Sequence, residues 1–268
     1  MKRIVTIVFV CVLAITAYAG WRGAFDDAYF AQVSDDGWTP IPDLIAHWKM
    51  NDNVANTDVE DSKGSYEGVS ARNTADMSIS GKINLALDYN GSSDTISAAT
   101  DSTLNTLFDG YHVLSVALWF KETLLAGRIL FLKFPDPYLT GLFMYNGIIN
   151  SNFKNNSDGN CTSVNYPEIG TNNVLSGNWN HVVWTYDGSG AASGHSLYFN
   201  NVVCTNKTVE RDFLSTAIVR TDNTQIGGLS PWGQWFSGAF DDIRVYTNIL
   251  SSSQVSALYN SGNGTEEE

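Results

Sequence analysis

"FSGAFDDIRVYTNILSSSQVSALY", residues 236–259, changes its periodicity halfway along. Residues 238–246 are rich in β-branched and aromatic side chains, which is typical of a strand. Ser251 then stands three places before Gln254, the spacing of a capping box that begins a helix. Apolar residues follow at helical spacing as far as Gly262, where the helix is expected to end. A long strand that leads into a short capped helix therefore closes the chain.

The part of the chain before this stretch consists of short apolar or alternating runs separated by turns. Strands are predicted at residues 44–50, 82–89, 114–121, 128–134, 141–147, 181–186, 196–201, 224–229 and 238–246. Hairpin turns are expected at 186–194 and 199–203. Many strands and one helix predict an all-β fold, a two-sheet antiparallel β-sandwich formed by residues 44–262.

The two ends of the chain differ from this pattern. Residues 1–19 combine Lys2 and Arg3, an apolar run and a small-residue site at Ala19, which predicts a signal peptide and a secreted protein. A retained membrane anchor is the alternative. Residues 20–43 are read as an N-terminal extension, and residues 263–268 as an acidic tail in solvent.

Charge and cysteine content limit the classes of partner. The net charge of −13, from 15 basic and 28 acidic residues, disfavours binding to nucleic acid and docking on anionic lipid. After signal cleavage the chain keeps Cys161 and Cys204, for which one disulfide is the simplest reading in an oxidising compartment. Two buried thiols are the alternative.

The pentamer GAFDD occurs twice, at residues 23–27 and 238–242. The first copy lacks the strand and helix that follow the second, so it does not mark a second domain. It is either a chance repeat in a linker or a segment that mimics the last strand and competes for the same sheet edge in a neighbouring copy.

Several segments in order resemble the laminin G-like branch of the concanavalin A-like lectin/glucanase superfamily. They are "LIAHWKMNDN" (44–53) with "DSKG" (61–64), "GKINLALDYNG" (81–91), "LSVALWFK" (114–121), "NWNHVVWTYDG" (178–188), "LYFNN" (197–201) and the closing stretch 236–259. The residue after Asn201 is not the usual Gly, and Gln254 replaces the usual Glu. The resemblance implies a jelly roll over residues 44–262.

Catalysis is not expected. Jelly-roll glucanases carry paired carboxylates as E-x-D-x-E on one strand face, and the sequence has no such run. His181 alternates with strand residues and is read as structural. The chain is therefore predicted not to be an enzyme.

The resemblance implies one structural calcium ion where the first and last strands meet. The matching residues are Asn51, Asp52, Asp61, and Asp241 or Asp242. Neighbours on a strand point to opposite faces, so only one of the last two is expected to be a ligand, and Asp241 is favoured. The alternative is that these acids cap turns and pair with Arg244 or Lys49.

Aromatic side chains divide into two sets. Four are candidates for stacking on sugars, namely Trp232, Trp235, Tyr138 and Tyr166. Four others are expected in the core, namely Trp48, Trp119, Trp179 and Trp184. The sequence predicts a secreted, lectin-like, non-catalytic module that binds carbohydrate or mediates adhesion at the cell surface or matrix. The alternative is a structural subunit that self-assembles through its N-terminal extension.

Overall fold

The computed structural model describes residues 40–123, 128–133, 140–145, 147–155, 160–167, 177–219, 221–229 and 233–268. Ile41–Glu266 and Glu268 form one compact unit. The predicted signal peptide, the first GAFDD copy and the N-terminal extension up to residue 39 lie outside the described residues. No helix in the described ranges is both long enough and apolar enough to span a bilayer.

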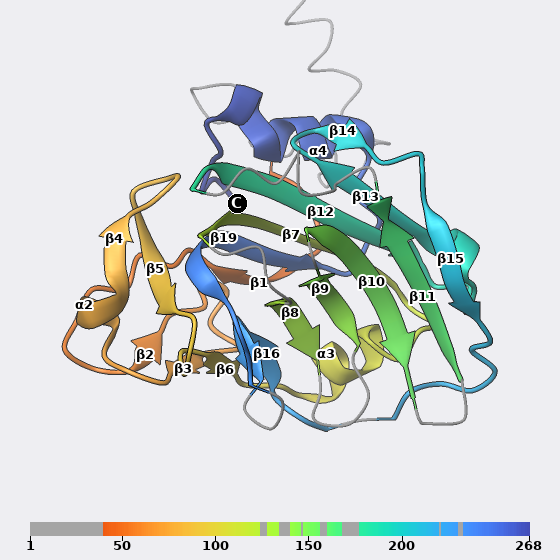
Figure 1. The fold of residues 1–268 in the computed structure, drawn as a ribbon, viewed down its shortest axis with the longest axis horizontal. Coiled ribbons are helices and arrows are strands. Elements are labelled where there is room, and N and C mark those ends of the chain that lie inside the picture. The colour runs from red at the N-terminus through yellow and green to blue at the C-terminus, as the bar shows by residue number, and fades with distance from the viewer. Residues whose placement is uncertain are drawn as a thin grey trace, which may run out of the picture. The chain divides into compact units, whose positions relative to one another are not determined.

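Two antiparallel sheets face each other (Figure 1). Sheet A has eight strands, in the order β14 (Val202–Val203), β13 (His195–Phe199), β12 (Trp179–Asp187), β7 (Val113–Glu122), β19 (Ser237–Tyr246), β5 (Leu85–Asn90) and β4 (Ser78–Ser80), with β1 (Leu44–Trp48) also paired to β19. Sheet B has nine, in the order β15 (Thr208–Asp212), β11 (Cys161–Tyr166), β10 (Ile148–Lys154), β9 (Gly141–Tyr145), β8 (Arg128–Lys133), β16 (Thr224–Ile226), β6 (Ile96–Ala98), β3 (Gly68–Ser70) and β2 (Asp58–Val59). The predicted two-sheet antiparallel β-sandwich is confirmed.

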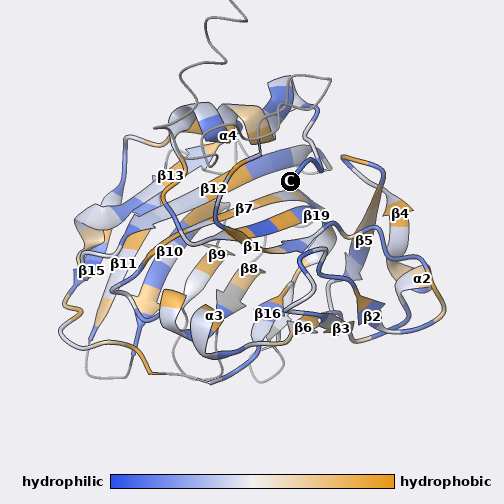
Figure 2. Cartoon of the chain, turned by 180° about the vertical axis from the view of Figure 1, so that it is seen from behind, coloured by the Kyte–Doolittle hydropathy of each residue, from blue (hydrophilic) through white to orange (hydrophobic). Residues whose placement is uncertain are grey.

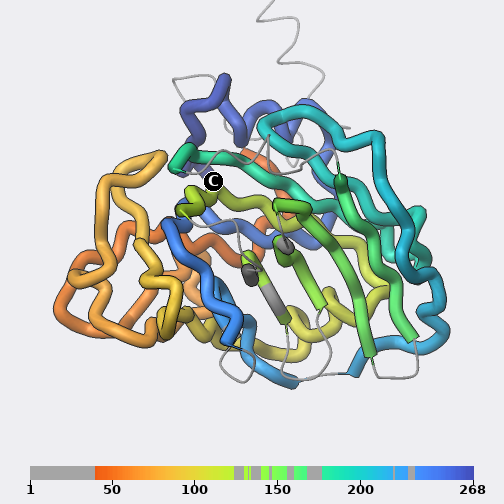
Figure 3. Tube along the Cα trace, viewed as in Figure 1, coloured from red at the N-terminus to blue at the C-terminus, as the bar shows by residue number. Residues whose placement is uncertain are grey.

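The remaining elements are short. A hairpin pairs β17 (Gly228–Leu229) with β18 (Gln234–Trp235). The α-helices are α2 (Thr74–Met77), α3 (Ser102–Leu107) and α4 (Ser252–Tyr259), and single 3-10 turns cover Ala192–Gly194 and Asn260–Gly262. Figure 3 traces the C-terminal part of the chain over sheet A.

The core forms between the sheets because each long strand alternates. Along β7, Leu114, Val116, Leu118 and Phe120 point inward and are fully buried. Each such side chain contributes about 1.5–3 kcal/mol when it leaves water. Figure 2 shows hydrophobic residues concentrated on the central strands, while the connecting loops are largely hydrophilic.

The outer face of sheet A is covered as well. Trp119 of β7 stacks on Tyr259 of α4, with 5.6 Å between ring centroids and an interplanar angle of 13°. Helix α4 begins with the predicted capping box, in which Ser251 and Gln254 each accept from the other's backbone N–H. Its buried Val255 faces the sheet, so burial and capping act together to hold the helix on this face.

Every predicted strand corresponds to a strand of the structure, but several strands were missed. β10 ("IINSNFK") and β11 ("CTSVNY") carry amides and hydroxyls among their apolar residues, which hides the alternation. β15 is exposed along its whole length and has no apolar face. The pattern therefore predicts strands with a regular apolar alternation and misses those in which polar residues interrupt it or no apolar face exists.

One of the four tryptophans assigned to the core is placed differently. Trp48, Trp119 and Trp184 are at most 1% exposed, as predicted. Trp179 is half-buried at the start of β12, where the Lys121 ammonium lies 5.2 Å from its ring centroid. Lys121 is also its partner on the neighbouring strand, so Trp179 makes a cation–π contact instead of packing in the core.

The predicted disulfide is not formed: Cys161 and Cys204 are both buried and no bond joins them. Cys161 begins β11 of sheet B, whereas Cys204 follows β14 of sheet A and donates its backbone N–H to the Leu197 carbonyl of β13. The alternative of two buried thiols describes the structure.

The last strand contains a β-bulge between Asp241 and Arg244. Asp242 has a φ of 48°, a left-handed conformation that Asp adopts more readily than most residues. Phe240 faces the core before the bulge, and Ile243 and Val245 face it afterwards. The extra residue therefore shifts the alternation of β19 by one position.

Gly238, the glycine of the second GAFDD copy, provides a test of this strand. Its φ is 137°, and a Cβ there would collide with the Lys121 carbonyl oxygen on β7. We expect Gly238→Ala to destabilise the protein by more than about 3 kcal/mol or to prevent folding, because a backbone atom cannot move away cheaply. Urea unfolding would measure the loss.

Gly64→Ala is the matched control, since Gly64 also has a positive φ, of 75°, but nothing lies within 4 Å of a Cβ built on it. Its expected cost is only about 1 kcal/mol of backbone strain. Equal losses in the two variants would contradict the close approach of β19 to β7.

Candidate functional site

The bulge in β19 brings two carboxylates to the same face of sheet A. Asp241 lies opposite Trp119 of β7, whose ring is on the outer face under α4. Asp242 contacts His47, which lies opposite Arg244 and also points away from the core. The prediction that the two acids face opposite sides is therefore wrong, because the inserted residue cancels the period-two rule.

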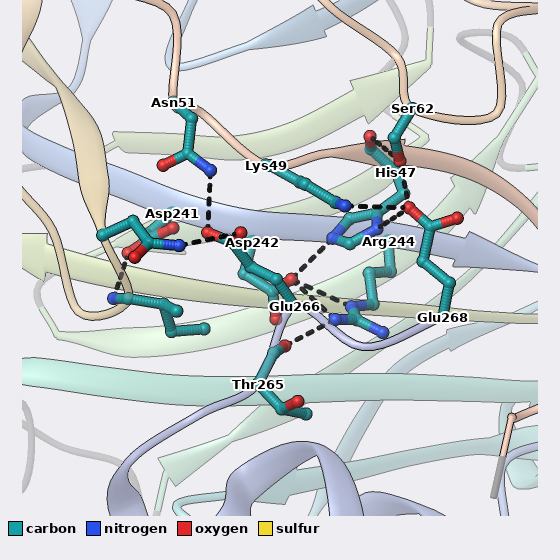
Figure 4. Close-up of polar contacts among 12 residues, drawn as sticks. His47, Lys49, Asn51, Ser62, Asp241, Asp242, Arg244, Thr265, Glu266 and Glu268 are labelled. Carbon is teal, nitrogen blue, oxygen red and sulfur yellow. Dashed lines mark hydrogen bonds and ion pairs between the residues drawn. The ribbon is translucent and has the colours of Figure 1, made fainter. Parts of the chain in front are cut away.

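These residues lie where two strands share one edge of β19. β5 pairs with Ser237–Phe240 and β1 pairs with Ile243–Tyr246, so the edge changes partner at the bulge. We call His47, Asn51, Asp241, Asp242 and Arg244 the seam cluster (Figure 4).

Asp242 forms the centre of a buried ionic network. Its Oδ1 accepts from His47 Nε2 at 2.7 Å and from Arg244 Nε at 2.9 Å, and it lies 2.9 Å from Arg244 Nη2. Burial alone would raise the pKa of Asp242, but the Arg244 guanidinium and His47 hold it below its ordinary value. Removing one partner of such a buried pair costs about 3–5 kcal/mol, so the network locks β1 onto β19.

Asp241 is held differently. Its Oδ2 accepts from the backbone N–H groups of Lys82 and Ile83 at 2.7 and 2.8 Å. Gly81 leaves room for this, since a Cβ there would meet both the Leu85 backbone and the Asp241 carboxylate. Oδ1 is buried and has no partner, and burial raises the pKa of Asp241 to about 8 despite those two hydrogen bonds.

The C-terminal segment returns to the seam cluster. The Glu268 carboxylate lies 3.0 Å from His47 Nδ1, 3.3 Å from Lys49 Nζ and 3.4 Å from Lys63 Nζ, and it also accepts from Ser62 Oγ. The Thr265 carbonyl accepts from Arg244 Nη2 at 2.5 Å.

The prediction that residues 263–268 form a tail in solvent is therefore wrong for this segment. Glu268 is only 26% exposed, because local cations on β1 and after it attract a carboxylate that the overall negative charge would repel.

Glu266 completes the site. It accepts from Asn51 Nδ2 at 2.9 Å and from Asn84 Nδ2 at 3.0 Å, and its charge contributes to the raised pKa of Asp241. The Asn51 Oδ1 in turn accepts from the backbone N–H of Leu85 at 3.0 Å, which joins the end of β1 to the start of β5.

The predicted calcium ligands do not converge as one set. The Asp61 oxygens accept from the backbone N–H groups of His47, Lys63, Ser65 and Tyr66, so this side chain organises the D-S-K-G turn. Asp52 accepts from the Glu60 N–H, and Asp242 is occupied by Arg244. No group of three or more His, Cys, Asp or Glu side chains suited to a metal occurs in the described part of the chain.

One predicted ligand keeps a carboxylate oxygen without a partner. The unpartnered Oδ1 of Asp241 has a second carboxylate, Glu266, nearby in the same negative field, and hard oxygens of this kind are what calcium prefers. The alternative reading, turn capping and pairing with Arg244, describes Asp61 and Asp242.

The residues predicted to stack on sugars differ in where they lie. Tyr166 is fully buried in the core and lies 3.5 Å from Ser151 Oγ, so it is not a surface platform. Trp235 on β18 is half-buried, with its ring packed against the backbone at Gly228. Trp232 and Tyr138 lie outside the described residues.

Sequence reasoning missed three members of this site. His47 was read only as part of a strand, and Glu266 and Glu268 only as part of a tail. The available signal was the group of basic residues at His47, Lys49 and Lys63, set against the three acidic residues that end the sequence.

The fold is a lectin-type jelly roll. It has two facing antiparallel sheets, a last strand that pairs with both β1 and β5, and a capped helix over the outer face. The chain belongs to the concanavalin A-like lectin/glucanases superfamily, whose sequence profile matches residues 90–256, more than half of its length. A search of curated proteins found no similar sequence.

Solved structures with the same fold include the binding domain of Paraclostridial Mosquitocidal Protein 1, at 13% identity and a TM-score of 0.59, over 82% of this chain and 52% of that one. Domain 4 of the extracellular GH43 arabinanase AbnA from Geobacillus stearothermophilus, in complex with arabinotriose, has 20% identity and a TM-score of 0.52, over 83% and 98%. The binding domain of botulinum neurotoxin DC in complex with SialylT has 13% identity and a TM-score of 0.54, over 82% and 52%. The chain thus spans about half the length of the two toxin binding domains.

Glu268→Gln tests the docking of the C-terminal segment. We expect the free energy of unfolding at pH 7 to fall by about 0.5–1 kcal/mol, since the carboxylate loses its attraction to Lys49 and Lys63 at a partly exposed position. The loss should shrink in 1 M salt. Glu60 is an exposed residue whose backbone N–H donates to Asp52. Glu60→Gln is therefore the control and should leave the unfolding curve unchanged.

Wild type and Glu268→Gln can also be compared as a function of pH. Burial raises the pKa of Glu268, but hydrogen bonds from Ser62 and His47 outweigh it and lower the pKa from 4.5 to about 2. A lowered folded-state pKa means that the contribution is full above pH 4.5 and is lost as the pH falls toward 2. The difference between wild type and Glu268→Gln should follow this course in urea titrations. A difference that instead grows on acidification would contradict the docking.

Proposed function

We propose that this chain is a secreted, non-catalytic, lectin-like module that binds carbohydrate at a cell surface or in an extracellular matrix. Its membership of a superfamily of lectins and glucanases, in a sequence without the glucanase carboxylate run, carries this proposal. Similar folds in a domain solved with bound arabinotriose and in receptor-binding domains of botulinum neurotoxins support it.

Two of the buried acids, Asp61 and Asp94, have structural roles rather than catalytic ones. Asp61 accepts four backbone N–H groups, and Asp94 pairs with Arg72 at 2.9 Å and accepts from Asn90. A general acid or a nucleophile must be able to reach its substrate, whereas these carboxylates are consumed by the turns that they organise.

The alternative, a self-assembling structural subunit, depends on residues 20–39, which lie outside the described residues, and it stays a prediction. The fully exposed edge strand β15 would offer a place for an added strand. Size-exclusion chromatography of a chain that lacks residues 20–40 would test it.

A glycan array and pull-down on insoluble polysaccharides test the main proposal. We expect the mature protein to be retained on at least one glycan and to be released by the free oligosaccharide, because a specific site is saturable. The bare matrix is the control. If no glycan retains the folded protein, either with calcium or with a chelator, the carbohydrate proposal fails.

We also propose that calcium binds at Asp241 with Glu266, where an unpartnered carboxylate oxygen is buried. A ligand at 100 times its dissociation constant adds about 2.7 kcal/mol to stability, so calcium should raise the melting temperature by several degrees relative to EGTA. Asp241→Asn should abolish the rise, and Asp76→Asn, an exposed control on α2, should keep it. Identical melting curves with and without calcium would sink this proposal.

A further inference from the structure

A second polar site lies at α3, separate from the seam cluster. It is a hollow of about 470 Å³, within the 300–1,000 Å³ that small-ligand sites usually have. Its described lining residues are Thr100, Asp101, Ser102, Asn105, Thr106, Asp109, Ala217, Ile218, Val219 and Thr221. Hydroxyl, carboxylate and amide groups thus face a short apolar patch.

A buried lysine fixes the direction of the hydrogen bonds in this hollow. Lys133 is 2% exposed, and its ammonium donates to Thr100 Oγ1 at 2.6 Å. An ammonium can only donate, so the Thr100 hydroxyl must pass its own proton on, and it donates to Asn105 Oδ1 at 2.9 Å. The engaged oxygen leaves the NH₂ group of Asn105, a double donor, available on a residue that lines the hollow.

The other wall of the hollow supplies acceptors. Asp101 Oδ1 caps α3 by accepting from the Leu104 N–H at 2.9 Å and also accepts from Tyr66 Oη at 3.0 Å. This leaves Oδ2 to accept from a ligand. The Leu104 hydrogen bond, with a smaller effect of that from Tyr66, outweighs burial and holds the pKa of Asp101 below its ordinary value, so the group is charged at neutral pH.

The segment that closes the hollow is anchored to α3. The Ile218 N–H donates to the Asp109 carbonyl at 2.9 Å, and the Ile218 side chain is 3% exposed. Val219 next to it is 86% exposed and offers an apolar surface at the rim. An apolar strip beside fixed donors and acceptors suits a ligand with one C–H face and several hydroxyls.

From this arrangement we infer that the α3 hollow is the saccharide subsite of the protein and that it selects neutral sugars. The inference rests on the proposed carbohydrate-binding function. A vicinal diol accepts from the Asn105 NH₂ and donates to the Asp101 carboxylate, while its C–H face lies on Val219. Asp101 and Asp109 place two carboxylates on the described lining of the hollow, so the negative charge of a sialylated or uronic sugar is repelled there.

Isothermal titration of the mature protein tests the inference with neutral trisaccharides of arabinose, galactose, xylose and glucose and with one sialylated trisaccharide. Asn105→Asp keeps the size of the side chain and the Thr100 hydrogen bond but replaces the donor by an acceptor. We expect it to weaken neutral-sugar binding at least tenfold. Asn73→Asp makes the same charge change at an exposed position before α2 and should bind as wild type does.

The other outcomes separate the two proposals. If a neutral sugar binds and Asn105→Asp binds it equally well, the subsite is wrong while the carbohydrate function stands, and loss of binding in Trp235→Ala would then move the site to β18. Preference for the sialylated sugar would also overturn the inference. If none of the sugars binds, the proposed function fails and the subsite fails with it.

Discussion

The single bulged residue Asp242 is the constraint on which the rest of the seam depends. With a positive φ it inserts one position into β19, so that core residues stay in phase on both sides while two successive acids share the outer face. The same insertion ends the pairing with β5 and starts the pairing with β1. Without it, either Asp241 or Asp242 would enter the apolar core, where an unpaired carboxylate is prohibitively costly.

Both acids lie on the outer face of sheet A, and each needs its own partners because it is buried there. Asp242 obtains charges, from Arg244 and His47, and Asp241 obtains backbone dipoles, from the glycine-led turn at Lys82 and Ile83. The first arrangement keeps the carboxylate ionised, and the second leaves it with a raised pKa. The acidic C-terminal segment can dock on a protein of net charge −13, because screening confines the interaction to charges within about 10 Å.

The sequence predicted the sandwich and the capped helix, because these depend on periodicity and local capping, and the family resemblance implied that the first and last strands meet. It did not predict which face of the sheet Asp241 and Asp242 occupy. A bulge depends on how strands distant in the sequence pair, and the dipeptide "DD" is the same with or without a bulge. The buried Tyr166 and the half-buried Trp179 were misplaced for a related reason: strand position gives the face, but the depth of cover depends on what packs there. The Lys133–Thr100–Asn105 relay depends on a contact between Lys133 and a residue 33 positions before it, so no local spacing indicates it.

The seam cluster and the α3 hollow differ in how completely the chain satisfies their polar groups. In the seam cluster nearly every donor and acceptor is matched within the molecule, apart from Asp241 Oδ1, so its contribution is to hold strands and tail together. In the hollow the relay uses one end of the Asn105 amide and orients the other outward, and the cap of α3 uses one oxygen of Asp101. Groups that are oriented by the fold but unmatched by it lose little entropy on binding, which is the condition for recognising a ligand as heavily hydrated as a sugar. The fold therefore stabilises itself at one site and leaves preorganised donors and acceptors at the other.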